Sequence, residues 1–133
     1  MKTMSSRGFT LVELLVVVAI IGILAAVGTI SYTGYVEGAK KKAAENAMQQ
    51  IGLAQTEEYS NSAEYYTQGD SCDPSDDNSK LIEDNILNGA DVITKDSGYT
   101  MCIETSGTSY IIKAVSGDGE TTITLTGNGV WGN

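Results

Sequence analysis

The feature that most constrains this chain is an apolar run near its N-terminus, from Phe9 to Ile30. Its 22 residues include one ionisable group, Glu13, and no polar residue interrupts the run from Leu14 to Gly28. At a rise of about 1.5 Å per residue, a helix of this length spans about 33 Å, which is enough to cross a bilayer core. The sequence therefore predicts a membrane-spanning helix.

A short leader, Met1 to Gly8, precedes the run, and its only charges are Lys2 and Arg7. A basic leader before an apolar helix fits a cleaved secretory signal, a plain anchor or a more specific processing signal. Secretory signal peptides have a shorter apolar region that ends in a small-residue cleavage site. Here the run is longer and the helical pattern continues for roughly 30 more residues. These features argue against a cleaved secretory signal.

Beyond Ile30, small apolar residues recur at spacings of three and four, which is the pattern of an amphipathic helix. We expect one long helix from about Phe9 to about Tyr59. Its first half is apolar on all sides, and its second half presents a mainly alanine stripe that suits close packing against a sheet. The stripe consists of Val36, Ala39, Ala43, Ala47, Ile51 and Ala54.

The segment from Asn61 to Asp77 is polar and holds the only proline, Pro74, so it is expected to be a loop. A short helix is predicted from Ser79 to Asn88, ended by Gly89. Its inward residues are expected to be Leu81, Ile82 and Ile86.

Three strands are predicted after this helix, because apolar residues alternate with polar ones. Turns are expected at Ser106-Gly107 and at Gly117-Asp118-Gly119, and Val130 with Trp131 suits a short edge strand. The predicted fold class is α+β, with a long helix packed on an antiparallel meander of three to four strands. The alternating residues are Tyr99, Met101 and Ile103, then Tyr110, Ile112 and Ala114, then Ile123 and Leu125.

The formal charge of the chain is −9, and loss of Lys2 and Arg7 with the leader would make it −11. The part from Thr56 onward holds 14 acids against three lysines. Such a surface repels phosphates and argues against nucleic-acid binding. The chain has no histidine and no clear nucleophile with a base, so we expect no enzyme activity and no catalytic residues.

A group of acids in the polar segment is the one candidate for a metal site. Calcium prefers oxygen-rich loops, but the spacing matches no EF-hand and lacks its glycine and terminal glutamate. A solvated loop is the favoured interpretation, so we expect no metal and no cofactor. The acids are Asp70, Asp73, Asp76 and Asp77.

The junction Arg7-Gly8-Phe9-Thr10-Leu11-Val12-Glu13 resembles the class III signal of type IV pilins and their relatives. The resemblance is close from Arg7 to about Tyr35 and architectural beyond, where the layout is similar to the type IV pilin ladle. It implies cleavage between Gly8 and Phe9 by a membrane-embedded prepilin peptidase, N-methylation of Phe9, and a registering role for Glu13 in assembly. One departure is Ile30, because the family often has a helix-kinking proline there.

The resemblance also implies the partners and the localisation. A single-pass precursor would reside in the inner (cytoplasmic) membrane, and the assembly machinery there would build it into a homo-oligomeric, extracellular filament. The resemblance places Lys40-Lys41-Lys42 outside the cytoplasm, whereas a simple count of positive charges on either side of the apolar run would place them inside. We expect these lysines to form a solvated helix face, with contact to the acidic heads of neighbouring subunits as the alternative.

Cys72 and Cys102 are the only cysteines, and they lie in the part expected to be exported. An even count in such a compartment indicates a disulfide, with two separate buried thiols as the alternative. A redox-active pair is disfavoured because the two are not in a C-x-x-C arrangement. Many type IVa pilins have one cysteine near the C-terminus, whereas both come earlier here.

The sequence thus predicts four parts: a leader (1–8), a membrane or filament-core helix half (9–30), an amphipathic half (31–59) and a globular head (60–133). The favoured function is a structural type IV pilus subunit, with adhesion, twitching motility or DNA uptake belonging to the polymer. The alternatives are a minor tip pilin that acts as adhesin or receptor, and a pseudopilin of type II secretion.

Overall fold

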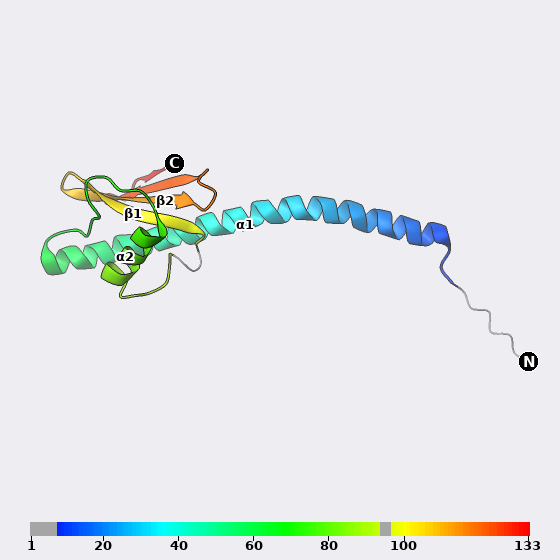
Figure 1. Ribbon diagram of the computed structural model, residues 1–133, viewed down its shortest axis with the longest axis horizontal. Helices are drawn as coiled ribbons and strands as arrows, with labels where there is room; N and C mark the ends of the chain where they lie inside the picture. Colours follow the sequence, from blue (N-terminus) through cyan, green and yellow to red (C-terminus); the bar gives the residue numbers. More distant parts are fainter. Residues whose placement is uncertain (1–7, 94–96) are drawn as a thin grey trace, which may run out of the picture. The chain divides into compact units, whose positions relative to one another are not determined.

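The fold begins with a 52-residue helix, α1 (Leu11–Ser62), and continues with α2 (Asp76–Ile86) and four strands (Figure 1). The computed structural model describes residues 8–93 and 97–133. Among these residues, those up to Glu37 form one unit and those from Gly38 form a second. The strands are β1 (Tyr99–Ser106), β2 (Ser109–Ser116), β3 (Thr122–Thr126) and β4 (Trp131–Gly132).

In the first unit, α1 is helical without interruption through Gly22, Gly28 and Gly34. From Leu11 to Tyr35 its large apolar side chains are all exposed, from 48% for Val16 to 80% for Leu11, and Val36 is half-buried. No other part of the described chain covers them. A helix that is apolar on all sides requires a surrounding that is itself apolar, such as lipid or other helices.

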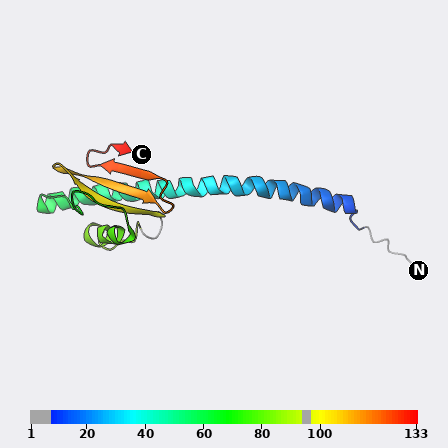
Figure 2. The same cartoon turned by 45° about the horizontal axis from the view of Figure 1, so that its top comes forward.

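In the second unit, the four strands form one antiparallel meander in the order β1-β2-β3-β4. The register pairs Ile103 with Ile112 and Ile112 with Leu125, so the alternating apolar residues line one face. This face lies against the C-terminal half of α1, with α2 beside β1 and β4 at the opposite edge (Figure 2). The predicted α+β fold is confirmed, including the edge strand beside β3.

The buried stripe of α1 differs from the predicted one. Ala47 and Ile51 are buried as expected, but Ala39 is exposed, and Ala43 and Ala54 are only half-buried. The helix face that meets the sheet is shifted by about one residue from the predicted face, and the polar residue Gln55 belongs to it. The buried stripe is Ala44, Ala47, Met48, Ile51 and Gln55.

Gln55 is fully buried because its amide is paired in both directions with one backbone residue. Its Nε2 donates to the Tyr66 carbonyl at 2.7 Å, and its Oε1 accepts from the Tyr66 amide at 2.8 Å. A buried polar group that makes its hydrogen bonds is well tolerated. Polarity alone favours an alanine over a glutamine at a buried position, which is why the sequence pattern predicted Ala54 and not Gln55 in the stripe.

The short helix begins at Asp76, earlier than the predicted Ser79, because Ser75 is its N-cap. The Ser75 hydroxyl accepts from the Asn78 amide at 3.2 Å, which satisfies an otherwise unpaired donor of the first turn. Ile82 is buried and Ile86 is half-buried, as predicted. The prediction for Leu81 was wrong: it is 47% exposed, and the inward position belongs to Ser79, whose hydroxyl accepts from the Met101 amide at 2.8 Å.

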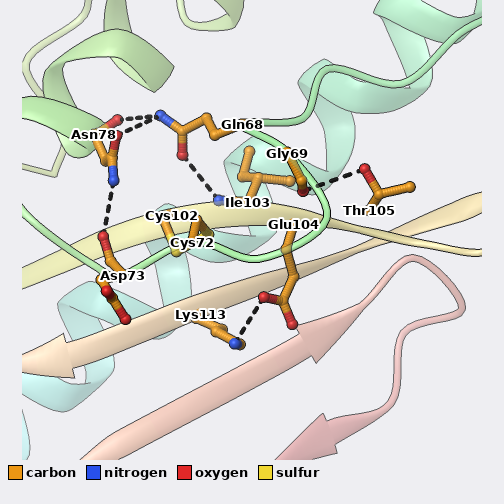
Figure 3. Close-up of polar contacts among 10 residues, drawn as sticks. All are labelled: Gln68, Gly69, Cys72, Asp73, Asn78, Cys102, Ile103, Glu104, Thr105 and Lys113. Atoms are coloured by element: carbon orange, nitrogen blue, oxygen red, sulfur yellow. Dashed lines mark hydrogen bonds and ion pairs between the residues drawn. A yellow bond between two sulfur atoms is a disulfide. The ribbon is translucent and has the colours of Figure 1, made fainter.

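The loop between α1 and α2 covers the outer edge of β1 (Figure 3). The Gln68 amide donates to the Ile103 carbonyl at 2.8 Å, and the Thr105 amide donates to the Gly69 carbonyl at 2.9 Å. The Cys72–Cys102 disulfide, with a Cα–Cα distance of 6.1 Å, joins the same loop to β1. An edge that is already paired cannot recruit another strand, so the loop protects the sheet from edge-to-edge association.

We expect replacement of both cysteines by serine to destabilise the second unit by roughly 3–4 kcal/mol, because the unfolded chain loses a cross-link across 30 residues. Denaturant unfolding of the wild-type protein and the double serine variant, both made as fragments that begin at Gly38 and so keep the core-forming half of α1, measures the effect. Insertion of α1 into membranes should be unchanged, since both sulfurs lie in the other unit. Equal unfolding midpoints for the two proteins would contradict this role of the disulfide.

Candidate functional site

The N-terminus of α1 is closed by a reciprocal pair of hydrogen bonds. The Glu13 amide donates to Thr10 Oγ1 at 3.2 Å, and the Thr10 amide donates to Glu13 Oε2 at 3.1 Å. This arrangement is a capping box, in which two unpaired backbone donors of the first turn are satisfied by side chains. It explains why the helix begins at Leu11 and not at Phe9, where the apolar run begins.

The capping box gives Glu13 a structural role that the sequence analysis missed. The spacing Thr-x-x-Glu at residues 10–13 is the signal that would have found it. The box engages only one carboxylate oxygen, and Oε1 makes no hydrogen bond within the described residues. A carboxylate has room for about four donors, so Glu13 can hold its own helix end and still accept a further donor.

The predicted cleavage site lies directly before this helix end. Gly8 and Phe9 are both exposed, and nothing lies within 4 Å of the position that a side chain on Gly8 would take. The chain itself therefore sets no steric demand for glycine at this position. A requirement for glycine would have to come from a protein that binds the junction.

α1 also passes a simple test for a membrane span. Among the described residues it is the one helix that is long and apolar enough to cross a bilayer, with a mean hydropathy of 2.8 over an 18-residue window. None of that window is buried within the chain. The site thus consists of an exposed glycine-phenylalanine junction, a capped helix end with one carboxylate, and an uncovered apolar helix.

Comparison with known families identifies a motif in this N-terminal region. Residues 3–29 match the family described as the prokaryotic N-terminal methylation motif. The chain carries a class III signal. This signal is characteristic of type IV pilins, and the long N-terminal apolar helix followed by a four-stranded antiparallel sheet agrees with the pilin ladle fold. No curated protein and no solved structure is significantly similar to the chain.

The acids of the predicted loop do not assemble into a site within the described residues. Asp76 and Asp77 belong to the first turn of α2, where carboxylates are favoured by the helix dipole. Asp70 and Asp73 are exposed in the loop, and Asp73 uses its backbone carbonyl to accept from Asn78 at 2.8 Å. Within residues 8–93 and 97–133, no three acidic or cysteine side chains come together as a metal site would require.

The described residues of the second unit form surface hollows, two of which lie along α1. One, of about 390 Å³, lies at the C-terminal end of α1 and is lined by Glu58, Ser62, Glu64, Tyr65, Tyr66 and Thr67. Burial raises the pKa of the Tyr66 phenol above its ordinary value. The other, of about 530 Å³, is lined by Gln49, Gly52, Leu53, Thr56, Tyr110, Leu125, Thr126, Gly127, Gly129 and Trp131.

Proposed function

We propose that this chain is a prepilin that becomes a structural subunit of a type IV pilus, cut between Gly8 and Phe9 and assembled through α1. The observation that carries the proposal is the uncovered apolar half of α1, where the large side chains from Leu11 to Ile30 are 48–80% exposed. In water such a surface is strongly unfavourable, at about 25 cal/mol for each Å². Lipid covers it in the precursor, and α1 helices of other copies cover it in the filament.

The second unit suits the coat of such a filament. Its edges are protected by the loop at β1 and by the short strand at β4, and it carries the acidic excess of the chain. An acidic head favours solubility of a densely packed polymer and disfavours nucleic-acid binding. The disulfide of the head supports a pilin over a pseudopilin. No enzyme activity is assigned, and adhesion, motility or DNA uptake would belong to the polymer.

Mass spectrometry of filaments sheared from the producing cells tests the proposal. We expect this chain to dominate the sheared fraction, with an intact mass that lacks residues 1–8 and carries one added methyl group on Phe9. A scarce chain within filaments made of another subunit would indicate a minor tip pilin. Full-length protein in assembled filaments, or no filaments that depend on this gene, would contradict the proposal.

A further inference from the structure

The C-terminal end of α1 breaks a charge rule of helices. Cations are favoured in the last turn, where the helix dipole is negative, yet α1 has no basic residue there and carries Glu57 and Glu58 one turn before its end. Ala63, which follows directly after the helix, adopts a positive φ of 58°, and Glu64 comes next. The chain therefore concentrates negative charge at a helix end that is already negative.

These acids have no cationic partner within the part of the chain that the structure describes. The two ion pairs found there join Lys42 to Glu45 and Lys113 to Glu104. Glu58 and Glu64 instead line the 390 Å³ hollow together with Tyr65 and Tyr66. Two carboxylates beside aromatic rings form a surface that suits an alkylammonium group, through ion pairing and cation–π attraction.

A complementary surface lies at the other end of the same unit. Lys40, Lys41 and Lys42 are three of the six cations that remain after removal of the leader, and the Lys42 side chain is 79% exposed. The stem of Lys40 lies against Gly98, 3.1 Å from the position that a Cβ there would take. Hydrogen bonding from the Ser116 hydroxyl, more than Lys40, lowers the pKa of Asp118.

The two surfaces cannot meet within one chain. Lys41 and Glu58 lie on the same helix 17 residues apart, which corresponds to about 26 Å along its axis. Different patches that are complementary and lie at opposite ends of one unit form a head-to-tail contact. Such a contact is not self-complementary, and it repeats into an open filament wherever the rotation between copies does not close a ring.

We propose that the hollow of Glu58 and Glu64 receives the Lys40–Lys42 run of a second copy of this chain. This inference rests on the proposed filament function and adds a charge-specific contact between heads to the assembly through α1. The contact sets which surfaces of two heads face each other, and it explains why acids stand at the end of α1 without a basic residue near them.

Carbodiimide cross-linking of sheared wild-type filaments, followed by peptide mass spectrometry, tests the contact directly. The reagent joins an ammonium to a carboxylate only where the two touch. We expect links from Lys40, Lys41 or Lys42 to Glu58 or Glu64, and the 26 Å separation within one helix makes any such link intermolecular. Links from these lysines only to other acids would overturn the proposal.

Charge exchange provides a second test. With Glu58→Lys and Glu64→Lys together, we expect filament yield to fall by about tenfold or more, because like charges then face each other across the contact. Adding Lys41→Glu and Lys42→Glu to the same subunit should restore most of the yield. The matched control, Asp70→Lys with Asp84→Lys, changes the net charge equally at exposed acids outside the hollow and should assemble normally.

The two proposals can fail separately. Wild-type cells whose filaments do not contain this chain would refute the filament function itself. Filaments that contain the chain but assemble equally well from the Glu58→Lys, Glu64→Lys subunit would refute only the head-to-tail contact. A loss of yield that the added Lys41→Glu and Lys42→Glu changes do not relieve would also count against the contact.

Discussion

A Glu13→Gln subunit, expressed as the only copy, is expected to enter the membrane, lose its leader and fold its head, yet to assemble few or no filaments. Cleavage would create a positive amine on Phe9, one helical turn from Glu13. An isolated carboxylate deep in a bilayer costs about 2.5–3.5 kcal/mol, so a partner is strongly favoured. The proposed partner is the Phe9 amine of a neighbouring copy, which would hold an incoming subunit at a fixed axial offset.

The capping box makes this substitution a sharp test. Glutamine can still accept the Thr10 amide, so Glu13→Gln preserves the helix cap and removes only the charge. Glu13→Ala removes both, and we expect it to fail at least as severely. Thr10→Ala is the matched control: it deletes a capping hydrogen bond at a cost of about 1 kcal/mol but keeps the carboxylate.

We therefore expect Thr10→Ala to assemble near normally while Glu13→Gln falls by roughly 100-fold, the ratio that about 2.7 kcal/mol represents. Filament mass in the sheared fraction, normalised to total subunit, measures the difference. An apolar medium penalises both the Glu13 carboxylate and the Phe9 amine, so their pairing fixes the axial register of a subunit more than it adds net affinity. The variant is therefore expected to lose assembly at the fixed axial offset. Wild-type yield from Glu13→Gln would rule the mechanism out.

The second large effect is expected at Gly8. Replacing Gly8 by leucine should block removal of the leader, because the peptidase must bring its catalytic carboxylates close to the backbone at this junction. Uncut subunit has no Phe9 amine, so filaments should be reduced to background. Immunoblotting of membrane fractions should show a single band that is eight residues heavier than the processed protein.

In the Gly8→Leu variant, blocked cleavage can be distinguished from loss of stability. Among the described residues nothing lies within 4 Å of a Cβ placed on Gly8, and Gly8 is far from the head in sequence, so Gly8→Leu should leave the fold and the thermal stability of the head unchanged. Gly8→Ala is the graded control, with the smallest added group and partial cutting expected. Complete processing of the Gly8→Leu protein would show that glycine is not what the peptidase reads.

Much of the fold follows from local sequence pattern. The apolar run and the spacing of three and four dictate one long helix, and period-two alternation dictates the strands, because each periodicity places apolar side chains on one face. The turns at Gly107 and Gly119, both with positive φ, follow from residue type as well. The class III junction is equally local, since it is a contiguous stretch of sequence.

Tertiary structure decided what depends on partners distant in sequence. Whether Gln55 or Ala54 faces the sheet depends on the Tyr66 backbone, and whether Ser79 or Leu81 faces inward depends on the Met101 amide. The hollow at the end of α1 also needs the fold, because the chain must reverse after Ser62 to bring Tyr65 and Tyr66 beside Glu58. Periodicity ranks residues by polarity alone, whereas burial of a polar side chain is decided by hydrogen-bond partners that only the folded chain supplies.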